Sequence, residues 1–233
     1  MRISAMALPA LRGTLRGVVF DMDGTLTIPV IDFPALYRAV LGSRHQPSSD
    51  KAIDILHEIE QWSPEEQQRA YATIAEYEKE GLDKLQFMPG AKELCDFIDE
   101  KKLKRGLITR NVKAAVDYFH ARFEKPHFSP ALSREFRPYK PNPAPLLHIC
   151  SAWGVPPHEV LMVGDHPKDD IVCGNKAGTA TCLLDQDDKY IVSHLSLLQR
   201  PTFKVRSLAE VLTLLQEKFD LKSGPETEAT TTP

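Results

Sequence analysis

Four short, mostly apolar runs along the chain have the length and composition of buried strands. They occupy residues 17–20, 105–108, 159–163 and 181–184. Segments with apolar residues at helical spacing alternate with these runs, at residues 91–102, 111–122, 146–153, 168–177 and 207–219. Strands that alternate with helices form a parallel sheet covered on both faces. The pattern therefore predicts an α/β fold with a Rossmann-like parallel sheet core.

The pattern changes between the first and second predicted strands. Residues 33–41 and 52–59 are short amphipathic runs. Ser63 and Glu66 form the sequence signature of a capping box, and Pro64 between them suits the first helical turn. The helix that begins there is expected to run to about Glu80 and to stop at Gly81. Residues 28–87 are thus predicted to be a small all-helical insertion in a core made of residues 16–27 and 88–222.

Both ends of the chain lack the apolar residues that anchor a segment in a core. Residues 1–15 contain Arg2 and Arg12 and no acidic residue, which favours a short disordered leader, with an organellar presequence as the alternative. Residues 223–233 are polar, which predicts a disordered tail.

Charge and cysteine content limit the partners and the compartment. The net charge is −3 and no long basic run is present, so neither nucleic acid nor an anionic membrane is expected as a partner. The four cysteines have no metal-ligand spacing and indicate a reducing compartment. No apolar run approaches the length of a membrane span. The prediction is a cytoplasmic protein, or an organellar one if the leader is a presequence, and the oligomeric state stays open.

Two carboxylates follow the first predicted strand directly, in the sequence Asp21-Met22-Asp23-Gly24-Thr25. The carboxyl end of a strand in an open parallel sheet is where ligands bind. Carboxylates this close repel each other unless a cation lies between them or one of them takes up a proton. The motif by itself therefore indicates either a metal site or an acid/base pair.

Three further segments have candidate chemistry at predicted strand ends or in stiff loops. Thr109 and the helix start after it could bind an anion, although a helix cap explains Thr109 equally well. Lys140 lies among three prolines that hold it in place, and the alternative is a Pro-rich surface linker. Asp165 is followed by two more aspartates, Asp169 and Asp170. Hard oxygen ligands favour Mg²⁺, whereas an acidic helix N-terminus would explain the last two aspartates but not Asp165.

These four segments, taken in order, resemble the motifs of the haloacid dehalogenase (HAD) superfamily. The resemblance covers residues from about 16 to 185, and the first motif (DxDGT) and the fourth (GDxxxDD) are the most specific. The helical insertion after the first motif is similar in position to the cap of that superfamily.

The resemblance implies a role for each candidate residue. Asp21 would be the nucleophile and would also contact Mg²⁺. Asp23 would be the general acid/base, with its backbone carbonyl on the metal. Asp165 would ligate Mg²⁺, and Asp169 would complete or orient the metal shell, while the role of Asp170 stays open.

The phosphoryl group of the substrate would be held by a second set of residues. Thr109 and Lys140 would bind its oxygens through their side chains, and backbone N–H groups around Gly24 and Arg110 would complete the anion site. His166 could reach the crevice, or could simply fill the fourth motif.

Asp23 separates the possible reactions within the superfamily. The dehalogenases of the superfamily lack a carboxylate at this position, so phosphoryl transfer is expected instead. The resemblance therefore implies a Mg²⁺-dependent phosphatase that acts on a small phosphorylated metabolite through an aspartyl-phosphate. A phosphoglucomutase-like mutase and a catalytically idle HAD-like binding protein are the alternatives.

Overall fold

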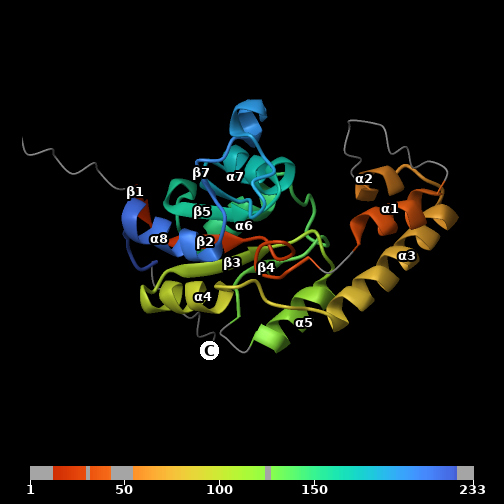
Figure 1. The fold of residues 1–233 in the computed structure, drawn as a ribbon, viewed down its shortest axis with the longest axis horizontal. Helices are drawn as coiled ribbons and strands as arrows, with labels where there is room; N and C mark the ends of the chain where they lie inside the picture. Colours follow the sequence, from red (N-terminus) through yellow and green to blue (C-terminus); the bar gives the residue numbers. More distant parts are fainter. Residues whose placement is uncertain (1–12, 30–31, 43–54, 124–126, 225–233) are drawn as a thin grey trace, which may run out of the picture. The chain divides into compact units, whose positions relative to one another are not determined.

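The structure of the protein is a computed structural model that describes residues 13–29, 32–42, 55–123 and 127–224. The chain divides into two compact units, Met1–Thr27 with Phe87–Pro233 and Ile28–Gln86. Figure 1 shows the ribbon coloured along the sequence. The predicted leader up to residue 12 and the predicted tail from residue 225 lie outside the described residues. Among the described helices, none is both long and apolar enough to cross a membrane.

Six strands of the larger unit form one parallel sheet (Figure 1). Its order is β4-β3-β2-β5-β6-β7, so the first strand of the sheet in the sequence is also a central one. All four residues of β2 are buried, as expected for a parallel strand with both faces covered. The bounds are β2 (Gly17–Phe20), β3 (Lys104–Ile108), β4 (Ala131–Leu132), β5 (Val160–Gly164), β6 (Ala180–Leu184) and β7 (Phe203–Val205).

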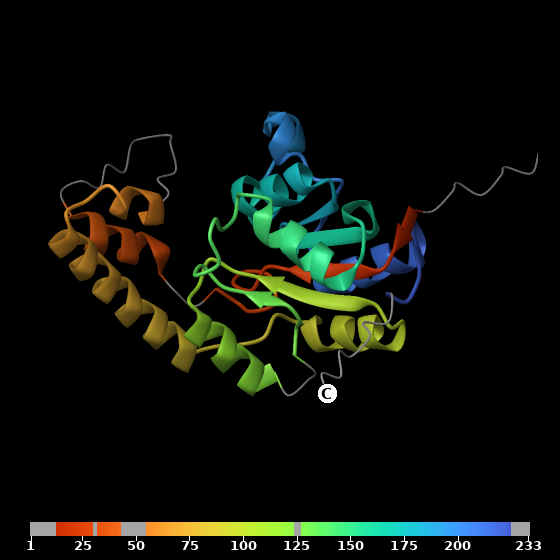
Figure 2. The same cartoon turned by 180° about the vertical axis from the view of Figure 1, so that it is seen from behind.

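Helices cover both faces of this sheet, as Figures 1 and 2 show. α6 and α7 pack on one face, where Val19 of β2 belongs to a core cluster with Leu146 and Met162. α4 and α8 pack on the other face, where the ring of Phe20 meets that of Phe128 edge-on at 6.0 Å. The bounds are α4 (Ala91–Glu100), α5 (Lys113–Phe123), α6 (Ala144–Trp153), α7 (Val172–Ala177) and α8 (Leu208–Lys218). The predicted α/β, Rossmann-like class is confirmed.

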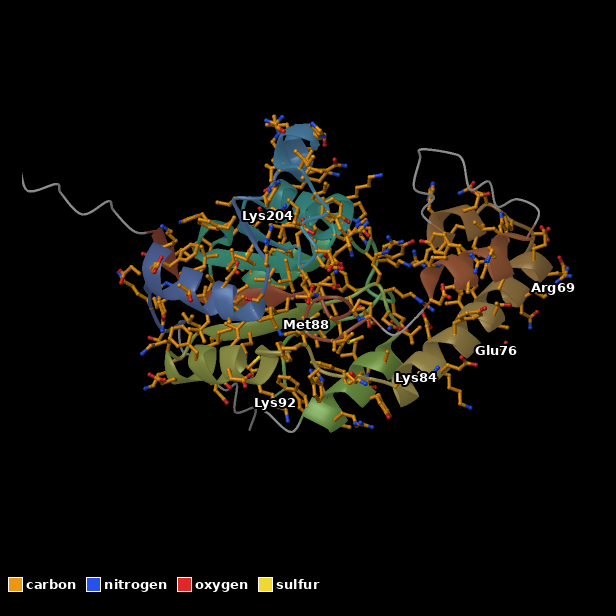
Figure 3. All side chains as sticks on the ribbon, in the orientation of Figure 1. Arg69, Glu76, Lys84, Met88, Lys92 and Lys204 are labelled. Atoms are coloured by element: carbon orange, nitrogen blue, oxygen red, sulfur yellow. The ribbon has the colours of Figure 1, made fainter. Side chains whose placement is uncertain are left out.

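The smaller unit contains only helices among its described residues: α1 (Phe33–Leu41), α2 (Ile55–Ile59) and α3 (Pro64–Asp83). The capping box at the start of α3 is present, because Glu66 N donates to Ser63 Oγ and Ser63 N donates to the Glu66 carboxylate. The predicted stop at Gly81 is wrong, since α3 continues to Asp83. On α3, Arg69 and Glu76 are exposed (Figure 3).

The predictions missed the shortest strands. β1 (Gly13–Leu15) pairs in parallel with β8 (Phe219–Leu221) in a separate two-stranded sheet. The prediction had placed the residues of β1 in the leader and Phe219 in the last helix. The predictions also named no strand at the residues of β4 and β7. Strands of two or three residues are too short to show an alternating pattern, and their pairing partners lie far away in the sequence.

Candidate active site

The carboxyl ends of β2, β3 and β5 meet at one edge of the sheet. In the strand register, Phe20 lies beside Leu107 on one side and Val163 on the other. The backbone N–H of Asp21 then donates to the carbonyl of Val163 at 2.9 Å. Asp21 therefore leaves β2 level with the ends of the strands that lead to Thr109 and Asp165. Because β3 and β5 lie on opposite sides of β2, this edge is a topological switch point, the usual ligand site of such sheets.

The ammonium group of Lys140 lies between two buried carboxylates at this edge. Its Nζ donates to Asp21 Oδ1 at 2.5 Å and to Asp170 Oδ1 at 2.7 Å. The lysine side chain is only 2% exposed. Burial acts against the charged form, but the two carboxylates outweigh it and raise the pKa of Lys140 above its usual range. Lys140 is therefore a fixed cation within the site.

Asp21, Asp165 and Asp170 form an acidic cluster in which one oxygen of each residue lies within 4.8 Å of the others. Burial raises the pKa of Asp21, and the neighbouring carboxylates add to this while Lys140 opposes it. Burial and the charge of Asp170 raise the pKa of Asp165 to about 7. The cluster thus contains three carboxylates and one ammonium group, so negative charge is in excess. A divalent cation that prefers oxygen ligands would offset this excess. The donor set fits Mg²⁺.

Gly24 makes room for this cluster. Its φ is 87°, and a Cβ at this position would lie 2.3 Å from Oδ2 of Asp165, so no other residue fits without displacing that carboxylate. The backbone N–H of Gly24 donates to the carbonyl of Thr27 at 2.9 Å. In this structure Gly24 supplies space and a turn. Its own N–H is engaged inside the turn, and the predicted binding of an anion by backbone N–H groups around Gly24 stays a prediction.

The fourth motif places Asp170, and not Asp169, against the cluster. Residues Pro167–Ile171 form a π-helical turn, which contains more residues per turn than an α-helix and shifts the direction of the side chains. As a result Oδ1 of Asp170 accepts from Lys140 and its Oδ2 accepts from the backbone N–H of His166 at 3.0 Å. The predicted membership of Asp169 in the metal-binding group therefore does not match the geometry.

Asp169 instead lies between two basic side chains. Its Oδ2 accepts from Arg110 Nη1 at 2.9 Å and lies 3.2 Å from His166 Nδ1. Burial alone would raise the pKa of Asp169, but the hydrogen bond to His166 and the charge of Arg110 lower it to about 2. The guanidinium of Arg110 also lies over the ring of Tyr139, 5.5 Å from its centroid. The side chain of Arg110 is thus engaged beside the site.

Asp23 has a different set of partners from Asp21. Its Oδ2 accepts from Asn111 Nδ2 at 3.2 Å and lies 3.5 Å from the hydroxyl of Thr109, while its Oδ1 lies 3.5 Å from the hydroxyl of Thr27. Burial raises the pKa of Asp23, and the hydrogen bond from Asn111 acts in the opposite direction. The prediction placed Thr109 here and missed Asn111. The sequence contains one signal for this residue, because Asn111 is the third polar residue after the second predicted strand. The prediction explains this position by a helix start alone.

The chain also matches known proteins over most of its length. Residues 15–178 match the family model described as haloacid dehalogenase-like hydrolase. The chain belongs to this family. The resemblance predicted from the four motifs is confirmed.

Two curated relatives align with nearly the whole chain. A haloacid dehalogenase-like hydrolase domain-containing protein of Arabidopsis thaliana is 63% identical over 212 residues, 89% of this chain and 86% of that protein. An uncharacterized hydrolase of Saccharomyces cerevisiae is 37% identical over 209 residues, 87% of this chain and 91% of that protein.

A more distant relative has a stated activity. The N-acetylmuramic acid 6-phosphate phosphatase of Pseudomonas aeruginosa is 28% identical over 185 residues, 73% of this chain and 81% of that protein. Among solved structures, a hydrolase from Pseudomonas syringae has a TM-score of 0.71 at 20% identity, over 88% of this chain and 99% of its own. Family membership and the phosphatases among its relatives identify this HAD-like hydrolase as a phosphoric monoester hydrolase.

Proposed function

We propose that the protein is a Mg²⁺-dependent phosphatase that hydrolyses a small phosphate monoester through an aspartyl-phosphate on Asp21. One observation supports this proposal above the others. Asp21 and Asp23 lie two residues apart at the ligand-binding edge of the sheet, yet one is held by a buried ammonium group and the other only by neutral donors. Two carboxylates with such different surroundings suit two different tasks, nucleophile and proton carrier.

Asp21 is positioned to attack phosphorus. Lys140 fixes its Oδ1 and partly offsets its charge, which reduces the repulsion between the carboxylate and an anionic ester. An ammonium group has three N–H donors. Two of them bind Asp21 and Asp170, so the third is available for a phosphoryl oxygen. This arrangement supports the predicted role of Lys140 as phosphate ligand.

The chemistry proceeds in two half-reactions. An oxygen of Asp21 bonds to phosphorus, the bond from phosphorus to the ester oxygen breaks, and the leaving oxygen takes the proton of Asp23. Water then attacks phosphorus, the bond from phosphorus to Asp21 breaks, and the proton released by water returns to Asp23. Thr109 is proposed to bind the phosphoryl oxygens through its side chain, and the main chain near Arg110 through its N–H groups.

A divalent cation is proposed to bind at Asp21, Asp165 and Asp170, together with the backbone carbonyl of Asp23. It would supply positive charge to the phosphoryl oxygens. We propose that the helical unit Ile28–Gln86 is the cap that restricts the site to small substrates, as the position of this insertion in the family implies.

The test is phosphate release by the purified full-length chain from a panel of sugar, acid and nucleoside monophosphates that includes N-acetylmuramic acid 6-phosphate. We expect release with Mg²⁺, none with excess chelator, and none from Asp21→Asn. Asp117→Asn is the matched control, because this aspartate is exposed and pairs with Lys113 on the surface of α5. Acid quenching during turnover should trap a phosphoryl group on the peptide that contains Asp21. The absence of release from the whole panel, or full activity of Asp21→Asn, contradicts the proposal. Measuring isomer conversion of hexose phosphates in the same samples separates a phosphatase from a mutase.

A further inference from the structure

The three donors near the Asp23 carboxylate are not equivalent. The hydroxyl of Thr27 has a single proton, which it donates to the carbonyl of Met22 at 3.1 Å. Asp23 Oδ1 lies farther from the same hydroxyl, at 3.5 Å. The hydroxyl of Thr109 is also 3.5 Å from Asp23, at the outer limit of a hydrogen bond. The amide of Asn111 at 3.2 Å makes the shortest of these contacts.

Asn111 is itself held at three points besides its contact with Asp23. Its backbone N–H donates to Thr109 Oγ1 at 3.0 Å, and its backbone carbonyl accepts from the N–H of Arg134 at 2.9 Å. Its side-chain Oδ1 accepts from the N–H of Val112 at 2.8 Å. Because that N–H can only donate, the amide oxygen must face Val112 and the NH₂ group must face Asp23. The hydrogen-bond network therefore fixes the orientation of the amide.

We infer that Asn111 is a positioning residue that holds Oδ2 of Asp23 and leaves Oδ1 as the oxygen that exchanges the proton. The inference rests on the proposed phosphatase function and adds to it a residue for which the resemblance implied no role. The amide NH₂ donates a hydrogen bond and cannot take up the proton of Asp23. The transferred proton therefore passes only between Asp23 and the leaving oxygen or the attacking water.

A purely structural role for Asn111 predicts a different outcome for one variant. The bond between Asn111 Oδ1 and Val112 N lies just before α5, so Asn111 also helps to begin that helix. Aspartate caps helices as well as asparagine does. Asn111→Asp therefore keeps the acceptor for Val112 and replaces the donor to Asp23 with an oxygen. Asn111→Ala removes both.

The experiment compares wild type, Asn111→Ala, Asn111→Asp and Ser207→Ala with two substrates at about pH 8, well above the ordinary pKa of aspartate. Ser207 caps α8 by accepting from Glu210 N at 3.2 Å, so its variant reports the loss of a helix cap alone. One substrate is an alkyl phosphate, whose leaving oxygen needs a proton, and the other is p-nitrophenyl phosphate, whose leaving group does not.

With the alkyl phosphate, we expect kcat to fall at least about tenfold in both Asn111 variants, with KM within about threefold of wild type. The first-turnover burst of p-nitrophenol should change less than about threefold, and Ser207→Ala should match wild type. Wild-type kcat in Asn111→Asp assigns Asn111 to the helix start alone and overturns the inference. So does an equal loss with both substrates in the first turnover, or an equal loss in Ser207→Ala. An inactive wild type instead overturns the proposed function, and the inference falls with it.

Discussion

Replacing Lys140 with methionine tests whether the buried ammonium group is what allows the acidic cluster to exist in the folded protein. The change keeps an unbranched side chain of similar length and removes only the charge and its hydrogen bonds. Asp21 and Asp170 would lose a partner at 2.5 and 2.7 Å. Removing one partner of a buried ion pair costs about 3–5 kcal/mol, because an uncompensated charge stays behind.

The assay is urea unfolding followed by circular dichroism, in excess chelator and again with Mg²⁺. We expect Lys140→Met to lose about 3–5 kcal/mol of unfolding free energy in chelator, which lowers Tm by about 6–20 °C for a chain of this size. The variant cluster holds one more uncompensated negative charge, so Mg²⁺ should bind it more tightly than the wild-type cluster. At equal Mg²⁺ concentration the variant should therefore gain more stability than wild type. Phosphatase activity should be lost in both conditions.

Lys204 provides a matched control in the same unit. Its Nζ also lies between two aspartates, Asp185 Oδ2 at 2.9 Å and Asp188 Oδ1 at 2.5 Å, but its side chain is 21% exposed. Lys204→Met should lose less stability, because Asp188 is half exposed and Asp185 keeps the backbone N–H donors of Lys189 and Tyr190. It should gain from Mg²⁺ no more than wild type does. If the two variants lose the same stability and respond equally to Mg²⁺, the assignment of the acidic cluster as a cation site is refuted.

Three further changes have distinct expected outcomes. Asp170→Asn should abolish the stabilisation by Mg²⁺ seen in thermal melts, whereas Asp169→Asn should retain it and lose only part of kcat. If Asp169→Asn abolishes the stabilisation and Asp170→Asn retains it, Asp169 is the metal ligand, as the sequence predicted. Gly24→Ala should lower kcat by at least about tenfold, because its Cβ would meet the Asp165 carboxylate, and a wild-type rate would contradict the tight approach. Burial and the charge of His127 lower the pKa of His120 to about 4. In the unfolded chain the pKa is about 6.5, so between about pH 4 and 6.5 the unfolded state binds more protons than the folded state. The protein should therefore lose about 1–2 kcal/mol between pH 7 and 5 that His120→Phe does not lose, and equal pH dependence in urea titrations would refute this.

Much of the site could be predicted from the sequence because its residues follow buried apolar strands directly. Asp21 and Asp165 have no freedom to lie elsewhere once β2 and β5 are parallel neighbours, and the register of the two strands brings them together. Lys140 could be predicted less directly, since only its prolines indicated a fixed position. The same local logic gave the capping box at Ser63, where both partners lie within one turn of helix.

The residues that could not be predicted depend on details of backbone geometry. The π-helical turn brings Asp170 against the cluster in place of the predicted Asp169, and no composition signal in the fourth motif distinguishes this turn from an ordinary α-helical one. Gly81 lies inside α3 because a single glycine costs a helix only about 1 kcal/mol, which packing in the helical unit can offset. Asn111 was missed because a polar residue at a helix start has an adequate local explanation, and its contact with Asp23 spans 88 residues of sequence.

The difference between the two aspartates of the first motif follows from the kind of partner that each one has. An ammonium group stabilises a carboxylate and opposes proton uptake, so Lys140 acts on Asp21 against the effects of burial and of the neighbouring carboxylates. Burial raises the pKa of both carboxylates; at Asp21 a directly hydrogen-bonded ammonium group opposes it, whereas the direct partners of Asp23 are neutral amide and hydroxyl donors with a weaker preference for the charged form. A nucleophile must be ionised and must not exchange its proton with the substrate, whereas a general acid must hold a proton and release it. The hydrogen-bond partners therefore favour the proposed assignment of the two tasks, because exchanging the roles of Asp21 and Asp23 would place the buried ammonium group against the residue that carries the proton.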